Sequence, residues 1–382
     1  MKKKAVSIFL AIIMVLSPVV SFAELDVTCK SALLMDFNTG NVIFAQNEHE
    51  KLPPASVTKI MTLLLAMEAI DSGKLKMDDK IVVSQYASSM GGTQVYLEQG
   101  EVQIVEDLIR AVSIRSANDA AVALGEGISG TNEGFINLMN ERAKSIGMNN
   151  TNFVNSSGLP VENHYTTAYD VALMSRELMK HSSIEKHLTT YMEDILVGKG
   201  KDDTQVMVNT NKLIRDYEGT TGIKTGSTNE AKYCVSASAK RGDLHLIAVI
   251  LGAETSAVRF NEAIKLLDYG FANYDSIPIG KKGEIIAKVP IEKADMMSLE
   301  LILERDYFAL VPKGNSGNIT KEVSCEEDIK SPIKQGDVLG SLTVLLDNKV
   351  IKKVNLVAKS DVENADLFLL LKRTFESFIT GS

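Results

Sequence analysis

The sequence has little of several residue types on which metal sites and disulfide frameworks depend. Its 382 residues include no Trp, 3 Cys and 5 His, and aromatic residues make up 6% of the chain. Three cysteines are too few, and odd in number, for a disulfide framework, and no H-E-x-x-H pair is present to bind zinc. Few aromatic rings also disfavour an aromatic-lined platform for sugars. We therefore expect no metal site, and we expect Cys234 to lie in a buried strand.

Positive charge is also scarce. The chain has 41 Lys and Arg against 49 Asp and Glu, which gives a formal net charge of −8. A nucleic-acid surface needs an excess of basic residues, so nucleic acid is excluded as a partner. Apolar residues make up 45% of the chain, which is enough for a normal core. At roughly 150 residues per domain, the length predicts two domains.

Long apolar runs are absent except at the beginning of the chain. Three lysines, Lys2 to Lys4, precede the apolar run from Ala5 to Leu16, and Ser21-Phe22-Ala23 offers the small residues that signal peptidase recognises. The run is short for a membrane span of ~20 residues. We therefore expect residues 1–23 to be a signal peptide rather than an uncleaved anchor, and the mature protein to be exported across the cytoplasmic membrane.

The alternation of apolar and polar residues predicts an α+β domain over residues 24–274. The expected elements are a hairpin over 31–46, helices over 57–70, 104–124, 132–146, 167–180 and 256–269, and strands over 232–239 and 244–252. A strand pair, a helical block, more strands and a last helix favour one antiparallel sheet flanked by helices, with a helical subdomain.

The pattern changes near residue 275. Short strands are expected over 284–291, 298–304 and 307–311, with a hairpin over 342–357 whose turn is Asp347-Asn348. We therefore expect a small β-sandwich domain over 275–362. Residues 363–382 form an amphipathic pattern, with Leu367, Leu371, Phe375 and Phe378 on one helical face and Lys372 and Arg373 beside them. This tail is expected to lie either on a membrane surface or against the β domain.

Three short motifs carry the chemistry. Ser56-Val-Thr-Lys59 follows two prolines at the start of an apolar helix, so the Ser56 hydroxyl lies near the positive end of the helix dipole and Lys59 lies one turn later. Ser116-Ala-Asn118 lies in the helical block. Lys224-Thr225-Gly226 precedes the strand pair, where an edge strand would flank a cleft. Other copies of the first two patterns lack this context.

These residue types favour nucleophilic acyl transfer. A serine hydroxyl needs a base, and no Gly-x-Ser-x-Gly elbow or Ser-His-Asp triad is apparent. A desolvated lysine has a lowered pKa and can act as that base, so Ser56 is the candidate nucleophile and Lys59 the candidate base. Ser116 can relay a proton, Asn118 can hold the base and the substrate amide, and Thr225 can bind a carboxylate, with Lys224 adding positive charge.

The segment Gly125-Glu-Gly-Ile-Ser-Gly130 matches the G-x-G-x-x-G pattern of dinucleotide sites. It follows a helical pattern rather than a strand, so we interpret it as a helix end and turn, and we expect no cofactor. We interpret His164 as a hydrogen-bonded structural histidine. Asp119 and Asp170 are interpreted as helix-terminal carboxylates rather than catalytic acids.

With these motifs in place, the sequence resembles the low-molecular-weight penicillin-binding proteins that are D-alanyl-D-alanine carboxypeptidases. The resemblance covers most of residues 24–274. The segments that carry it are Pro54–Met61, Ser116–Ala120, Asn155–Pro160 with His164–Asp170, Thr221–Gly226 and Arg259–Glu262. The β region and the tail resemble the second domain and the anchor of that family more loosely.

The resemblance implies roles for these residues. Ser56 would be acylated by a peptidoglycan stem peptide ending in D-Ala-D-Ala, or by a β-lactam inhibitor, and water would release the product. Backbone N–H groups of Ser56 and Ser227 would form the oxyanion hole, the peptide would lie beside the strand that contains Gly226, and Thr225 and Arg259 would bind its carboxylate. Some relatives carry His where this chain has Ser227. The resemblance also favours a tail attached to the outer face of the cytoplasmic membrane.

Two alternatives stay open at this point. A class A β-lactamase would share the fold and motifs, but Glu162-Asn163 lacks the Glu-x-x-Leu-Asn spacing of that family. A non-catalytic wall-binding module on the same fold would not need all three motifs intact.

Overall fold

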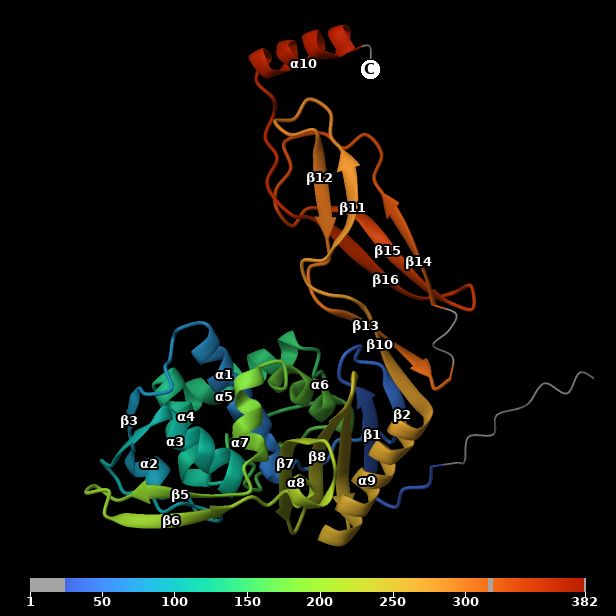
Figure 1. The fold of residues 1–382 in the computed structure, drawn as a ribbon. Helices are drawn as coiled ribbons and strands as arrows, with labels where there is room; N and C mark the ends of the chain where they lie inside the picture. Colours follow the sequence, from blue (N-terminus) through green and yellow to red (C-terminus); the bar gives the residue numbers. More distant parts are fainter. Residues whose placement is uncertain (1–24, 315–318, 381–382) are drawn as a thin grey trace, which may run out of the picture.

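The computed structural model describes residues 25–314 and 319–380, so the predicted signal peptide lies outside the described residues. Figure 1 shows an α+β part at the bottom, an all-β part above it and a last helix at the far end. The two parts meet where β10, Tyr274–Gly280, pairs with β13, Tyr307–Pro312. The α+β class with a following all-β domain is therefore confirmed.

The α+β part is built on one five-stranded antiparallel sheet with the order β2-β1-β9-β8-β7. Its strands are β1 (Ser31–Asp36), β2 (Val42–Gln46), β7 (Thr220–Thr228), β8 (Lys232–Arg241) and β9 (Leu244–Ala253). Every residue of β9 is buried because helices cover both faces of the sheet. Helix α9 (Ser256–Asn273) packs on one face, and α6 (Ala168–Leu178) with α1 (Lys59–Asp71) on the other. Strand β7 is left at an edge.

The helical subdomain differs from the expected single helix over 104–124. The structure has α3 (Val105–Arg110), a π-helical segment over Ala111–Arg115 and then α4 (Asn118–Ser129). The break falls at Ser116, which adopts a left-handed backbone with φ of 65°. The apolar pattern runs through the break because both helices are buried. The break itself is held by tertiary contacts, since the Asn118 amide N–H donates to the carbonyl of Thr93.

Apart from α5, the remaining elements of this part are short. They are β3 (Lys80–Val82), α2 (Gln85–Ser88), β4 (Val102–Ile104), α5 (Asn132–Ser145), α7 (Glu185–Thr189), β5 (Met192–Val197), β6 (Asp203–Val208) and α8 (Leu213–Asp216), with 3₁₀ turns at Ala55–Thr58 and Ser182–Ile184. The hairpin of β5 and β6 was not predicted. Its outward-facing residues include apolar side chains such as Leu196 and Val206, so the alternation that marks a half-buried strand is weak.

The β domain has its own core and a five-stranded sheet with the order β11-β12-β16-β15-β14. The strands are β11 (Ile285–Pro290), β12 (Ser298–Ile302), β14 (Ile319–Cys325), β15 (Val338–Leu346) and β16 (Lys349–Ala358). Asp347 and Asn348 both have positive φ, as a two-residue hairpin turn of type I′ requires. The predicted hairpin is therefore confirmed. The chain ends in α10 (Leu367–Thr380).

Candidate active site

Ser56 and Lys59 meet at the entrance to α1. The residues after Pro53-Pro54 form a 3₁₀ turn, and the α-helix begins only at Lys59. A 3₁₀ turn has three residues per turn, so side chains at positions i and i+3 eclipse each other. This geometry brings Lys59 Nζ to 3.0 Å from Ser56 Oγ.

Lys59 is fully buried, and its Nζ has three hydrogen-bond partners. Besides Ser56 Oγ, these are Asn118 Oδ1 at 2.7 Å and the carbonyl of Ser157 at 2.6 Å. Burial lowers the pKa of Lys59 well below its usual value, and the positive charge of Lys224 contributes in the same direction. In its deprotonated form the amine has two N–H groups for the two carbonyl-type oxygens and a lone pair for the Ser56 hydroxyl.

Ser116 and Asn118 lie beside this pair at the break between the helices. Asn118 Nδ2 donates to the carbonyl of Gly91 at 2.7 Å, which fixes the amide so that Oδ1 faces Lys59. Ser116 Oγ is buried and has no hydrogen-bond partner in the part of the chain that the structure describes. An unpartnered buried hydroxyl is uncommon, and it is available to a bound substrate.

Asp119 holds the break in place. Its carboxylate accepts hydrogen bonds from the backbone N–H groups of Val95 and Leu97, and burial raises its pKa. The contacts agree with its interpretation as a structural carboxylate. Asp170 is similar, because its carboxylate accepts from the Asn150 N–H and the Thr151 hydroxyl.

The edge strand β7 brings the third motif against Ser56. A Cβ added at Gly226 would lie 2.8 Å from the backbone nitrogen of Ser56 and 2.9 Å from that of Val57, so only glycine lets the strand approach this closely. Lys224 is buried, and its Nζ donates to the carbonyl of Thr225 at 3.2 Å. Burial lowers the pKa of Lys224 to about 7, and the charge of Arg259 adds to this effect.

Thr225 of the third motif and Ser227, which follows the motif, have different surroundings. Thr225 Oγ1 lies 2.6 Å from Thr210 Oγ1. No sequence motif includes Thr210, so this partner was not predicted. Ser227 lines a cavity of about 590 Å³ together with Tyr233 and Glu254.

Arg259 packs against the third motif. It is buried, and its Nη1 donates to the carbonyls of Gly226 at 3.1 Å and Cys234 at 3.3 Å. The guanidinium therefore clamps β7 to β8 at Gly226. Burial lowers its pKa to about 10. Cys234 is fully buried in β8, as predicted.

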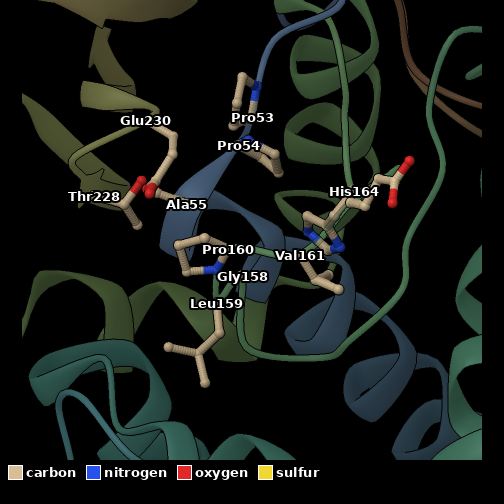
Figure 2. Close-up of a pocket in the computed structure, with 11 residues that line it drawn as sticks. Pro53, Pro54, Ala55, Gly158, Leu159, Pro160, Val161, His164, Thr228 and Glu230 are labelled. Carbon is tan, nitrogen blue, oxygen red and sulfur yellow. The ribbon is translucent and has the colours of Figure 1, made fainter.

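A cavity of about 370 Å³ lies beside Ala55, the residue before Ser56. Figure 2 shows Thr228 and Glu230 on one side of Ala55, and Val161 and His164 on the other. The lining residues are Pro53, Pro54, Ala55, Gly158, Leu159, Pro160, Val161, Glu162, His164, Thr228 and Glu230. A Cβ at Gly158, which has a φ of +82°, would overlap the carbonyl of Ala55, so this residue must be glycine for the wall to close.

His164 is a structural histidine, as predicted. The Val154 N–H donates to its Nδ1 at 3.0 Å, so Nε2 carries the proton and donates to Thr58 Oγ1 at 2.8 Å. Burial lowers the pKa of His164 to about 4, and the ring therefore stays neutral at physiological pH.

The glycine pattern over 125–130 serves packing. Gly125 and Gly127 lie inside α4, where an added Cβ would come within 2.6 Å of Phe135 and 2.4 Å of Ile81, and Gly130 ends the helix with φ of +85°. The helix-end interpretation is confirmed. Within residues 25–314 and 319–380, no group of three His, Cys, Asp or Glu side chains is placed to hold a metal ion.

Two family models match the chain. The model described as D-alanyl-D-alanine carboxypeptidase matches residues 18–255, and the one described as penicillin-binding protein 5, C-terminal domain, matches residues 274–364.

Curated relatives and solved structures agree with this assignment. D-alanyl-D-alanine carboxypeptidase DacF of Bacillus subtilis is 44% identical over 92% of this chain and 90% of its own. DacC of Escherichia coli is 32% identical over 90% of this chain and 86% of its own. The crystal structure of penicillin-binding protein 5 from Haemophilus influenzae has a TM-score of 0.76 and 30% identity, covering 89% of this chain and 98% of that one. The chain therefore belongs to the D-alanyl-D-alanine carboxypeptidase family of penicillin-binding proteins.

Proposed function

We propose that the protein removes the terminal D-Ala from peptidoglycan stem peptides that end in D-Ala-D-Ala, through an acyl-enzyme on Ser56. One observation carries this proposal. Lys59 Nζ is buried, is held by Asn118 Oδ1 and the Ser157 carbonyl, and lies 3.0 Å from Ser56 Oγ. A neutral amine in this position is a general base for the hydroxyl.

The reaction runs in two steps. Lys59 accepts the Ser56 proton as Oγ attacks the carbonyl carbon of the penultimate D-Ala. Backbone N–H groups of Ser56 and Ser227 stabilise the oxyanion. The C–N bond then breaks, and the proton reaches the leaving amine through the Ser116 hydroxyl, which frees D-Ala. In the second step water attacks the ester, its proton returns to Ser56 Oγ, and the shortened peptide leaves.

Substrate binding uses the edge of β7. The peptide adds to this edge as an antiparallel strand, since no strand of the described sheet covers it. Its terminal carboxylate is attracted by Lys224 and accepts a hydrogen bond from Thr225, and Arg259 keeps the Gly226 carbonyl in position from behind. A bound carboxylate favours protonated Lys224, so substrate binding raises the lowered pKa of this lysine.

Penicillin is the sharpest probe of the mechanism. Intact-protein mass spectrometry after incubation with benzylpenicillin is expected to show one adduct, and peptide mapping is expected to place it on Ser56. Ser56→Ala is expected to abolish both the adduct and D-Ala release, while Ser183→Ala, in another S-x-x-K copy, retains both. A full-stoichiometry adduct on Ser56→Ala would falsify the assignment.

The same experiment separates the peptidase from the β-lactamase alternative. The relatives named above are carboxypeptidases and penicillin-binding proteins, which favours the peptidase. We therefore expect the penicilloyl adduct to persist over many minutes. Its hydrolysis within seconds would favour a β-lactamase.

The location is part of the proposal. We propose export by the segment 1–23 and attachment of α10 to the outer surface of the cytoplasmic membrane. Among the described residues, no helix is both long and apolar enough to span a bilayer. Leu367, Phe368, Leu371 and Phe375 are each more than 60% exposed, so the part of the chain that the structure describes does not cover this apolar stripe. A stripe of this kind suits the interface between headgroups and acyl chains.

Arg373 fastens α10 to the β domain. Its Nη1 donates to the carbonyl of Ala294 at 2.6 Å and its Nη2 to that of Asp295 at 2.8 Å. Vesicle flotation tests the attachment. The full-length protein is expected to float with vesicles, whereas a form ending at Asp361 stays in solution. Equal behaviour of the two forms would reject the tail as the anchor.

A further inference from the structure

A cavity of about 630 Å³ lies where the two parts of the molecule meet. It is lined by the turn between β1 and β2, the end of α6, and the turns and strands of the β domain that face them. Its charged lining residues are Arg176, Lys180, Lys282, Arg305, Asp306 and Lys352. None of these residues belongs to the proposed catalytic or substrate-binding set.

The charge of this cavity is opposite to that of the whole chain. Five of its lining side chains are basic and one is acidic, whereas the sequence has 41 basic and 49 acidic residues. The cations come from both sides of the junction: two from α6 and its end, and three from the β domain. Without an anion, these cations repel each other across the junction.

Most of this positive charge is not neutralised by the protein. Lys282, Arg305 and Lys352 pair with no carboxylate in the part of the chain that the structure describes. The one acidic lining residue, Asp306, accepts the backbone N–H of Lys282 at 2.8 Å. Lys180 pairs with Glu177, whose carboxylate also contacts Arg142.

Arg176 is held in place as a donor. Its Nε donates to the carbonyl of Phe37 at 2.6 Å and its Nη2 to that of Asn38 at 3.1 Å. Among the described residues, Nη1 and one hydrogen of Nη2 have no acceptor, so they can donate to a ligand. Burial lowers the pKa of Arg176. The nearby carboxylates of Glu177 and Asp36 oppose this shift, and the positive charge of Arg305 adds to it.

We propose that this junction cavity binds an oligoanion that carries phosphate groups. Guanidinium groups form paired hydrogen bonds to phosphate, and several cations spread around one cavity match several phosphates better than one carboxylate. A bound phosphate chain contacts both parts of the molecule and removes the repulsion between them. It therefore couples ligand binding to the relative position of the parts, independently of the peptidase activity.

Isothermal titration of the full-length protein tests the proposal with two probes, tripolyphosphate and poly(glycerol phosphate). Saturable binding of either is expected, and the probe that binds tells whether the source is a free oligophosphate or a phosphodiester polymer. Binding is expected to weaken between about 50 mM and about 300 mM salt because surface charges are screened. Arg305→Gln is expected to weaken binding about tenfold or more, the effect of one lost charge-assisted hydrogen bond.

Lys352 and Lys353 provide a matched pair. They are neighbours in β16 whose side chains point to opposite faces, and only Lys352 lines the cavity. Lys352→Gln is expected to weaken binding several-fold, and Lys282→Gln likewise, whereas Lys353→Gln leaves the affinity within twofold. Ser56→Ala is expected to bind as the natural protein does, so failure of the peptidase assignment leaves this test intact.

Three results would overturn the proposal. They are the absence of saturable binding for both probes, an equal loss in Lys352→Gln and Lys353→Gln, and binding of polyglutamate with the same affinity as the phosphate probes. The last would mean that the cavity attracts any polyanion.

Discussion

Replacing Lys224 by methionine is expected to stabilise the free enzyme while it disables catalysis. Lys224 is buried, and its pKa is lowered from 10.5 to about 7. That difference corresponds to about 4 kcal/mol of folding free energy at pH 7, because the unfolded chain binds a proton that the folded chain holds weakly. Methionine has a similar volume and no charge, but it loses the bond to the Thr225 carbonyl, worth ~1 kcal/mol. The net gain is about 2–3 kcal/mol.

The sign of the pH dependence makes the prediction specific. Between pH 7 and 10.5 the unfolded chain takes up a proton at residue 224 more readily than the folded chain does, so the natural protein gains stability as the pH rises. The advantage of Lys224→Met is therefore largest at pH 7 and small near pH 10. For a domain of this size, the gain at pH 7 corresponds to roughly 5–10 °C in Tm.

Differential scanning calorimetry at pH 7 and pH 10 measures the effect on the transition of the α+β part. Lys240→Met is the matched control, because Lys240 is an exposed lysine on β8 of the same sheet. The free energy of unfolding of Lys240→Met is expected to differ from that of the natural protein by less than about 0.5 kcal/mol. Destabilisation of Lys224→Met at pH 7, or a gain of the same size at both pH values, would refute the reasoning that Lys224 is desolvated.

Two further substitutions test individual roles. Lys59→Arg keeps the positive charge but cannot give up its proton, so penicillin acylation is expected to fall by about 10²–10⁴-fold. The rise of the acylation rate with pH through the lowered pKa of Lys59 is expected to disappear as well; stopped-flow acylation measures both, and a rate within tenfold of the natural enzyme would contradict the base role. Arg259→Ala removes the two bonds to the Gly226 and Cys234 carbonyls together with a positive charge. We expect kcat/KM on a D-Ala-D-Ala peptide to fall by a factor that corresponds to about 1.5–3 kcal/mol of transition-state stabilisation, and the rate of penicillin acylation to fall less. Unchanged peptide kinetics would show that the clamp is not needed for turnover.

Elements whose pattern depends on near neighbours were predictable from the sequence. The hairpin of β1 and β2, the start of α1 after two prolines and the turn at Asp347-Asn348 all depend on residues within a few positions of one another. The break at Ser116 was missed because its cause lies in another segment. The Asn118 N–H bonds to Thr93, and Asp119 holds the backbone of Val95, so tertiary contacts override a continuous helical pattern.

The chemical types of the site could be identified from local sequence patterns: a serine and a lysine one turn apart, a second serine with an asparagine, and a lysine before a glycine on an edge strand. The protonation of these groups depends on the tertiary structure. Lys59 has a lowered pKa because α1 is buried, and it is directed at Ser56 because the Ser157 carbonyl arrives from about 100 residues away. Arg259 likewise became a clamp for β7, and five cations met in one cavity, through folding alone. Desolvation and charge proximity depend on which distant segments pack together, and no local pattern encodes that.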